Sequence, residues 1–486
     1  MRQGRRKFNS NTKTIIEFYY NHSSLHHDLQ LYVFTYYRSN PKTFNPYKLN
    51  ISNWIASMKD LGAKHGVLTA KHGCGFLLWP TNTTLPGGSP YYYDISNTIH
   101  KRNIVAEFSN EMGRAGLGHG FYYSLARNFY LNVNQHLVNG SKSLLPGQQN
   151  VTQAQFESIA IGHLKELWSM YGNLTEIWFD GGYKSDMKEN LTNLLSELQP
   201  NSVGWNGVGI SKSPILWVGT ESGHPKGDGI WSTGCKYGNG DPNSSLFCPK
   251  GVDTTLQTDD KWFFGKDYPV RTLEDLVDVY HESVGHNGVL ELDFAINERG
   301  LVEPAHADMY RNFGNWIKKC YRKPVSQGVI GHGEEQGLLK IPHKTPIDRL
   351  MLQEDISDGQ KVREFIIYRK GFNGRTWVFL YKNNAGIGNK KIVIFDETIQ
   401  TDELKIVITK SMGSDSGEIK VSAFHPRNCK LPVNAIPKPT RPQLRQQSHE
   451  IVALITFNMA TFSRDGDPGC GIDNWNIKAD YASGPT

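Results

Sequence analysis

The sequence lacks the signature motifs of several large enzyme classes. It has no phosphate loop ending in G-K-[ST], no G-x-S-x-G nucleophile turn and no H-E-x-x-H zinc motif. Its six cysteines never occur in C-x-x-C spacing and have no histidines clustered beside them, which argues against a zinc site. A stretch from Asp465 resembles part of a calcium loop, but Asn476 stands where such a loop needs Glu. We therefore predict no metal and no cofactor.

Long apolar runs are also missing. No stretch approaches the roughly 18 apolar residues of a membrane span, so we predict none. The opening MRQGRRKFNSNTKTIIEF has charges but no apolar core, and is not a usable signal peptide. The net charge is +6, with basic residues scattered and densest at Arg2, Arg5, Arg6 and Lys7. A solvated terminus explains that cluster better than a nucleic-acid arm, so we predict no nucleic-acid partner.

Other features favour the secretory pathway. Eight asparagines begin an N-x-S/T glycosylation sequon, more than chance supplies: Asn21, Asn50, Asn82, Asn139, Asn150, Asn173, Asn190 and Asn243. Cys235 and Cys248 flank a loop rich in Gly, Asn, Pro and Ser, where they can pair in an oxidising compartment. We expect a glycoprotein that is extracellular or lysosomal, with a true N-terminus that is missing or misassigned here.

Short apolar strands alternate with amphipathic helices from about 43 to 325. The predicted strands are His65–Lys71, Gly116–Tyr123, Leu174–Phe179, Ser202–Asn206, Ile215–Val218 and Val289–Leu292. The predicted helices are Thr152–Tyr171, Met187–Leu198, Leu273–Val284 and Glu303–Lys319. Such alternation implies a parallel sheet, and both a closed barrel and an open doubly wound sheet satisfy it.

The pattern changes from about 336. Five short strand-like runs follow, separated by Gly, Asn and Asp turns: Arg363–Arg369, Thr376–Tyr381, Lys391–Phe395, Glu403–Thr409 and Glu418–Phe424. Regular short strands with almost no helical signal predict a β-sandwich over 336–430. Residues 1–42 remain an unassigned N-terminal segment, and 431–486 are a proline-rich linker and an unassigned tail.

Two acids follow predicted strands in a similar way. Asp180 ends EIWFD and precedes two glycines, and Glu221 in WVGTESG follows the strand that begins at Ile215. In a parallel α/β barrel the reactive groups lie where strands end, so the two acids can face each other across one sugar ring. Glycoside cleavage needs such a pair, one carboxylate to attack the anomeric carbon and one acid to protonate the leaving oxygen. A single Asp-Gly is more often an ordinary turn, which is the simpler alternative for Asp180.

Two further polar groups close predicted strands. His72 follows the strand that ends at Lys71, although a lone histidine is more often a structural residue. Tyr122 and Tyr123 end the next strand. Because side chains alternate along a strand, one of the two tyrosines must face the lumen and the other the helices.

Six segments, in order, resemble glycoside hydrolase family 29, the α-L-fucosidases. They are TAKHGCGFLLWPT, GHGFYYS, EIWFDGG, WVGTESG, DTTLQTDDKWF and SVGHNGVLELDFAINERGLVE, and together they cover the chain from 43 to about 325. WVGTESG and DTTLQ look like the branch that cleaves α-1,3/1,4-linked fucose. The resemblance implies an α/β fold, a (β/α)8 TIM-like barrel followed by a C-terminal β-sandwich.

The resemblance also implies roles for five residues. Asp180 would be the nucleophile that forms a covalent fucosyl-enzyme, and Glu221 the acid/base. His72 and Tyr122 would hydrogen-bond fucose, and Trp262 would pack against its C6 methyl group. The implied activity is that of a retaining exo-α-L-fucosidase whose partner is a fucosylated oligosaccharide or glycoprotein glycan. The implied Glu221 chemistry requires a protonated acid, and hence a raised pKa.

The sequence also departs from the family pattern. The family's first strand carries a histidine in an H-x-G segment, which the stretch 27–40 does not have. Gly73 and Cys74 replace the family's second His and its acidic neighbour, and Gly251 replaces a Glu. Each loss removes hydrogen bonds to sugar hydroxyls. Two alternatives therefore stay open: a catalytically impaired relative that binds fucose or glycans, and an interaction protein that acts through the sandwich. The sequence does not indicate an oligomeric state.

Overall fold

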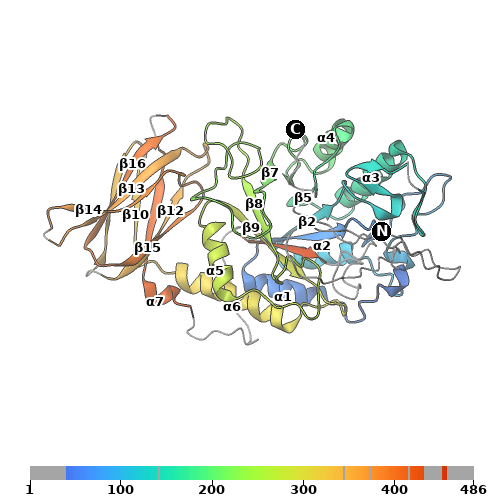
Figure 1. Cartoon of the computed structure of the whole chain (residues 1–486), viewed down its shortest axis with the longest axis horizontal. Helices are drawn as coiled ribbons and strands as arrows, with labels where there is room; N and C mark the ends of the chain where they lie inside the picture. The colour runs from blue at the N-terminus through green and yellow to red at the C-terminus, as the bar shows by residue number, and fades with distance from the viewer. Residues whose placement is uncertain are drawn as a thin grey trace, which may run out of the picture.

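The computed structural model describes residues 40–140, 143–342, 345–372, 374–413, 416–431 and 451–456. Figure 1 shows a barrel surrounded by helices, with a β-sandwich beside it. This confirms the predicted fold class. The strand-like stretch 27–39, most of the N-terminal segment and the proline-rich linker lie outside the described residues.

Eight strands form the closed barrel, and neighbouring strands are parallel. In order around it they are β1 (His65–Lys71), β2 (Gly118–Tyr123), β5 (Glu176–Trp178), β6 (Val203–Trp205), β7 (Pro214–Trp217), β8 (Lys250–Thr254), β9 (Val289–Ala295) and β18 (Ile451–Thr456). The strand order follows the sequence order. Each strand therefore sends its carboxyl end to the same rim, which is where a barrel of this kind carries its site.

Six helices cover the described part of the barrel. They are α1 (Ile51–Leu61), α2 (Ile104–Arg114), α3 (Gln153–Ser169), α4 (Lys188–Leu198), α5 (Leu273–Glu282) and α6 (Pro304–Tyr321). Their apolar faces join one continuous core with the outer faces of the strands. In α3, Thr152 and Gln155 form a capping box that fixes where the helix begins. No helix among the described residues directly follows β6 or β7; loops connect these strands to the next ones, and the loop after β7 carries Glu221.

The predicted elements agree with the observed ones to within a few residues at each end. Several observed elements were not predicted, among them the helices α1 and α2 and the strands β8, β10 (Ser326–Ile330), β11 (Gln336–Lys340), β12 (Ile347–Glu354) and β18. In β8 the sequence is KGVDT, yet all five residues are buried, because both faces of a parallel strand are covered. The closing strand β18 comes from the tail left unassigned by the sequence, and it pairs Val452 with His65 and Ile451 with Leu290.

The C-terminal part is a sandwich of two antiparallel sheets. One sheet has the order β10 (Ser326–Ile330), β17 (Ile419–Phe424), β12 (Ile347–Glu354) and β15 (Lys391–Ile399). The other has the order β11 (Gln336–Lys340), β16 (Glu403–Ser411), β13 (Val362–Lys370) and β14 (Trp377–Asn383). Their inner faces share a core that includes Leu350 and Phe365. The remaining elements of the described residues are short. They are the hairpin of β3 (Val133–Asn134) and β4 (Leu137–Val138), the helix α7 (Pro426–Cys429) and a few 3₁₀ turns.

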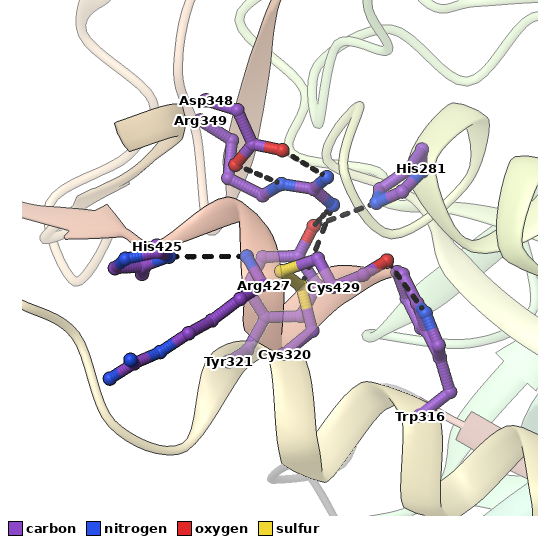
Figure 2. Close-up of a disulfide and its surroundings, with 9 residues drawn as sticks. All are labelled: His281, Trp316, Cys320, Tyr321, Asp348, Arg349, His425, Arg427 and Cys429. Carbon is purple, nitrogen blue, oxygen red and sulfur yellow. Dashed lines mark hydrogen bonds and ion pairs between the residues drawn. A yellow bond between two sulfur atoms is a disulfide. The ribbon is translucent and has the colours of Figure 1, made fainter. Parts of the chain in front are cut away.

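Two disulfides are present among the described residues. Cys235–Cys248 closes the loop between β7 and β8, which confirms the predicted pairing. Cys320–Cys429, which the sequence did not suggest, joins the end of α6 to α7 across 109 residues. Figure 2 shows its surroundings, where Trp316 Nε1 donates a hydrogen bond to the Cys429 carbonyl at 3.1 Å. This disulfide therefore ties the sandwich side of the chain to a barrel helix.

We expect Cys320→Ser to destabilise the protein by about 2–5 kcal/mol, since it releases a cross-link that closes a long loop in the unfolded chain. Denaturant unfolding under oxidising conditions measures the effect. Cys235→Ser is the comparison, because its disulfide spans only 13 residues and the entropic model gives it a smaller cost. Equal costs for the two variants would contradict the loop-length argument.

Candidate functional site

Both predicted catalytic acids lie at the carboxyl ends of barrel strands. Asp180 follows β5 and Glu221 follows β7, and these two strands flank β6. Trp178 of β5 and Trp205 of β6 stack with their ring centroids 4.0 Å apart. Burial raises the pKa of Glu221, and the negative charge of Asp180 adds a smaller contribution. The two carboxyl groups therefore share one electrostatic environment at the barrel mouth.

Asp180 accepts a hydrogen bond from a neighbouring strand. The Tyr122 hydroxyl donates to Asp180 Oδ2 at 2.5 Å. Tyr123, next in the chain, faces outward, where a 2.9 Å hydrogen bond joins its hydroxyl to His163 Nδ1 on α3. The predicted alternation of the two tyrosines is thus confirmed. Gly181, with φ +71°, follows Asp180, and a Cβ there would lie 2.9 Å from Ala126 Cβ, so the turn needs glycine.

Glu221 is partly buried and receives a hydrogen bond from Trp262. The indole Nε1 of Trp262 donates to Glu221 Oε2 at 3.2 Å. Burial raises the pKa of Glu221 to about 7, with smaller contributions from the charges of Asp180 and Asp260, while the Trp262 hydrogen bond acts in the opposite direction. Glu221 is therefore a carboxyl that exchanges its proton near neutral pH, which suits a general acid that later becomes a base.

His72 lies beside the nucleophile candidate. Its ring stacks on Tyr122 at 5.7 Å between centroids and meets the edge of Phe263 at 5.0 Å. Burial lowers its pKa to about 4, against the opposing influence of Asp180, so the imidazole is neutral at pH 7. Its Nδ1 is buried and has no hydrogen-bond partner in the protein. A buried atom of that kind is available to a ligand hydroxyl.

Some residues of this region did not stand out in the sequence. Asp253, at the end of β8, is buried and accepts a 2.7 Å hydrogen bond from Trp217 Nε1. Burial, and after it the charge of Glu221, raises the pKa of Asp253 well above its usual value. Like Asp180 and Glu221, Asp253 is an acid at the carboxyl end of a barrel strand. The strand β8 was not predicted, because polar and apolar residues are mixed in its sequence. His136 was missed as well; its Nε2 lies 3.1 Å from the Gly181 carbonyl oxygen.

The position of Gly251 has a structural explanation. A Cβ at this glycine would lie 1.6 Å from the Trp205 ring, so the indole occupies the space that any side chain at 251 would need. At Gly73, by contrast, the nearest atom to a Cβ is Arg127 Cβ at 3.5 Å, which is ordinary contact. The space beside Gly251 is thus filled by Trp205, whereas the position of Gly73 has room for a side chain.

Neither a metal cluster nor a membrane helix occurs in the part of the chain that the structure describes. No group of three or more His, Cys, Asp or Glu side chains there is arranged to hold a metal ion. No helix among the same residues combines the length and apolar character that crossing a membrane requires.

Comparison with known sequences agrees with this geometry. The family model described as Alpha-L-fucosidase matches residues 6–321. Alpha-L-fucosidase 1 of Arabidopsis thaliana is 23% identical over 428 residues, which cover 77% of this chain and 78% of the plant protein. Plasma alpha-L-fucosidase of Homo sapiens is 27% identical over 287 residues, 55% of this chain and 53% of the human protein. The chain therefore spans most of the plant relative and about half of the human one.

Solved structures share the fold. A “putative alpha-L-fucosidase” from Bacteroides thetaiotaomicron has a TM-score of 0.69 and 26% identity, covering 80% of this chain and 90% of its own. A glycoside hydrolase 29 family member from an unknown rumen bacterium has a TM-score of 0.68 and 23% identity, covering 84% of this chain and 74% of its own. The barrel followed by a sandwich is therefore an architecture that these proteins have in common.

Proposed function

Because the chain belongs to the α-L-fucosidase family, glycoside hydrolase family 29, we propose that it is a retaining exo-α-L-fucosidase. One observation carries the proposal: two carboxyl groups at one barrel mouth have contrasting environments. Asp180 accepts a hydrogen bond from Tyr122, while desolvation raises the pKa of the partly buried Glu221 to about 7. Carboxyl groups separated in this way suit a nucleophile and an acid/base, respectively.

In the proposed mechanism Asp180 attacks the anomeric carbon of a terminal α-linked L-fucose. Glu221 donates its proton to the departing sugar oxygen, and a covalent fucosyl-enzyme forms. Glu221, now a carboxylate, removes a proton from water, which releases fucose and regenerates Asp180. Two inversions give net retention, a route that works with carboxyl groups about 5–5.5 Å apart. The Tyr122 hydroxyl orients the Asp180 carboxylate through their 2.5 Å hydrogen bond.

The same pocket suits a deoxy-hexose. His72, neutral and with a buried unpartnered Nδ1, is placed to hydrogen-bond a sugar hydroxyl. Trp262 adds an indole face beside Glu221, a surface for the C6 methyl group that distinguishes fucose from a hexose with a hydroxyl at that carbon. Trp262 thus has two proposed tasks, to pack on the sugar and to orient the acid/base.

We also propose the finer assignments. The segments WVGTESG and DTTLQ favour α-1,3/1,4-linked fucose on an oligosaccharide or glycoprotein glycan. Location in the secretory pathway, either extracellular or lysosomal, is supported by the two disulfides. Surface sequons add to this, since six of the seven described sequon asparagines are exposed: Asn50, Asn82, Asn150, Asn173, Asn190 and Asn243.

Incubation with a chromogenic aryl α-L-fucoside tests the activity, and proton NMR of the first-formed product tests retention. A Lewis-type trisaccharide and an α-1,2-fucosylated one, offered in parallel, test the linkage. We expect release of α-L-fucose from the aryl fucoside and preference for the Lewis-type sugar. Glycan binding without turnover would reject the enzymatic proposal in favour of a binding protein.

The rate should depend on pH through Glu221. Because kcat/KM requires the protonated acid, and the pKa of Glu221 in the free protein is about 7, kcat/KM should fall above pH 7. The decline should reach about tenfold per pH unit well above the pKa. A pH series with an aryl fucoside measures it. Trp262→Phe, which removes the hydrogen bond that lowers this pKa, should move the alkaline limb to higher pH, and an unmoved limb would contradict the assignment.

A further inference from the structure

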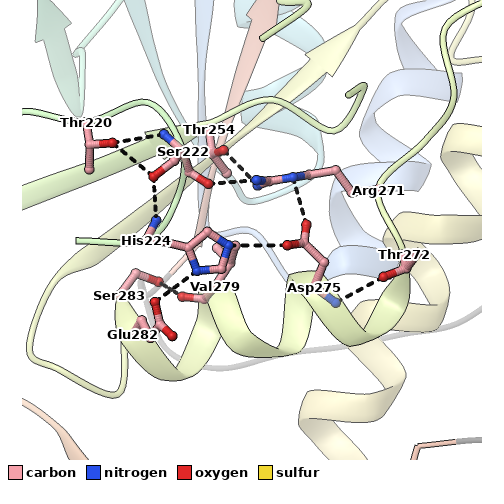
Figure 3. A network of polar contacts seen from close by, with 10 residues as sticks. All are labelled: Thr220, Ser222, His224, Thr254, Arg271, Thr272, Asp275, Val279, Glu282 and Ser283. Atoms are coloured by element: carbon pink, nitrogen blue, oxygen red, sulfur yellow. Dashed lines mark hydrogen bonds and ion pairs between the residues drawn. The ribbon is translucent and has the colours of Figure 1, made fainter. Parts of the chain in front are cut away.

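The segment that carries Glu221 is fastened to the start of α5 by an arginine. Arg271 Nη2 donates to the Ser222 carbonyl at 2.7 Å, and Arg271 Nη1 donates to Thr254 Oγ1 at 2.9 Å. Its Nε pairs with Asp275 Oδ2 at 2.8 Å. Figure 3 shows this guanidinium between the end of β8, the Glu221 segment and the helix. One side chain thus fixes the residue after Glu221 to two other elements.

A histidine in the same segment provides a second attachment. His224 Nδ1 lies 2.9 Å from Glu282 Oε2, and His224 Nε2 lies 3.2 Å from Asp275 Oδ1. Asp275 therefore contacts both Arg271 and His224, one with each carboxylate oxygen (Figure 3). Along the chain, Glu221 stands between the end of β7 at Trp217 and the attached residues Ser222 and His224. The carboxylate of Asp275 therefore holds the segment from the side of α5.

Packing closes the remaining gap between the segment and α5. Gly223 has φ +79°, and a Cβ there would lie 2.8 Å from Val279 Cγ2 and 3.1 Å from Thr254 Cγ2. Only glycine permits this approach without displacement. The hydroxyl of Ser222, 2.9 Å from that of Thr220 and 3.1 Å from the His224 amide nitrogen, braces the turn internally.

We propose that Asp275, through Arg271 and His224, is a positioning residue for the acid/base Glu221. The inference rests on the proposed function and deepens it. Proton donation to a leaving oxygen needs a heavy-atom distance of about 2.6–3.2 Å, and a misplacement of about 1 Å can cost on the order of 10²-fold in rate. Asp275 touches no reacting atom in this scheme; it acts by holding the backbone from which Glu221 projects.

The test is Asp275→Asn in the full chain, measured with two aryl α-L-fucosides whose leaving phenols differ in acidity. The amide keeps the shape but removes the negative charge that pairs with Arg271, and an NH2 group turned toward Arg271 would face a donor. A weakly acidic phenol needs proton donation and a strongly acidic one does not. We expect kcat for the poor leaving group to fall about tenfold or more, within the range for loss of general-acid assistance, and kcat for the good one by less than about twofold.

Glu303→Gln is the matched control. Glu303 is the residue just before α6. Its Oε2 also pairs with an arginine four residues earlier, Arg299 at 2.9 Å, and accepts a hydrogen bond from Asn297 Nδ2. This variant should leave the leaving-group dependence unchanged. Equal loss on both substrates in Asp275→Asn, or no loss, would overturn the inference, whereas a selective loss that Glu303→Gln does not share supports it.

Hydrogen exchange separates this inference from the activity itself. Amides of the segment 220–224 should exchange at least about fivefold faster in Asp275→Asn than in Glu303→Gln, because opening of a locally held segment controls their exchange. If the unmodified protein turns over neither fucoside, the proposed function fails, and the catalytic role of Asp275 fails with it. Exchange then decides whether Asp275 holds the segment: unchanged exchange would overturn that part as well.

Discussion

Asp180→Ala is expected to lower kcat for an aryl α-L-fucoside by at least about 10³-fold, because losing the proposed covalent nucleophile removes the two-step route altogether. The fold should be unaffected, since Asp180 is only partly buried and its neighbour Tyr122 is packed against Trp178 and His72. Initial rates and a thermal melt of the same preparation measure both quantities. The loss should appear in kcat rather than in KM, as for an interaction made in the transition state.

A small external nucleophile offers an independent check on Asp180. Azide can occupy the space left by the removed carboxylate and attack the anomeric carbon from the same face. Asp180→Ala should then regain part of its turnover and form β-L-fucosyl azide, the product of a single inversion. Tyr122→Phe is a useful comparison, since it removes the 2.5 Å hydrogen bond to Asp180 but leaves the nucleophile. Asp180→Ala with nearly normal activity would exclude this residue as the nucleophile.

Ala453→Asp is expected to prevent the protein from folding. Ala453 lies in the middle of β18, is fully buried, and pairs with Gly66 on one side and Leu292 on the other. An unpaired carboxyl there must be desolvated within the core, at a cost of more than about 4 kcal/mol. That is a large share of a typical total stability of about 5–15 kcal/mol. Soluble yield and the unfolding midpoint measure the effect.

The control for Ala453→Asp is the same substitution at an exposed alanine. Ala154 lies in the first turn of α3, where a negative charge is favoured by the helix dipole. Ala154→Asp should therefore change stability by no more than about 0.5 kcal/mol. Removal of residues 432–486 should resemble Ala453→Asp, because it leaves β1 and β9 with unpaired barrel edges. If the protein stayed well folded with Ala453→Asp or without residues 432–486, then β18 would not be needed to complete the barrel.

Much of the barrel was predictable because its strands and helices are locally consistent. β1, HGVLTAK, was predicted with the observed bounds, and α5 with the same first residue. β8 was missed because Lys250 and Asp253 interrupt its apolar pattern. Lys250 is buried through hydrogen bonds from Nζ to the carbonyls of Gly234 and Lys236, at 2.6 and 2.9 Å. Those partners lie 16 and 14 residues earlier, in the loop that precedes β8, beyond the reach of a strand-length sequence pattern.

The candidate site divides in the same way. Asp180, Glu221 and His72 were found from one rule, that polar residues directly after parallel strands meet at one rim. That rule left Tyr122 and Tyr123 open, and the family resemblance chose Tyr122. The hydrogen bond between Trp262 and Glu221 was not predictable, since it joins a loop to a strand end 41 residues away. The same is true of Asp275, whose contacts with Arg271 and His224 depend on how α5 lies against the loop after β7.

The sequence by itself determined the alternation of strands and helices, the family, and the identity of most side chains that gather at the barrel mouth. Periodicity and residue type are local properties, and they encode these features directly. Only the tertiary structure decided that residues 451–456 close the barrel and that Trp205 fills the space above Gly251. It also decided that burial raises the pKa of Glu221. Strand pairing, close packing and desolvation each depend on residues that are remote in the chain, and these meet only once it has folded.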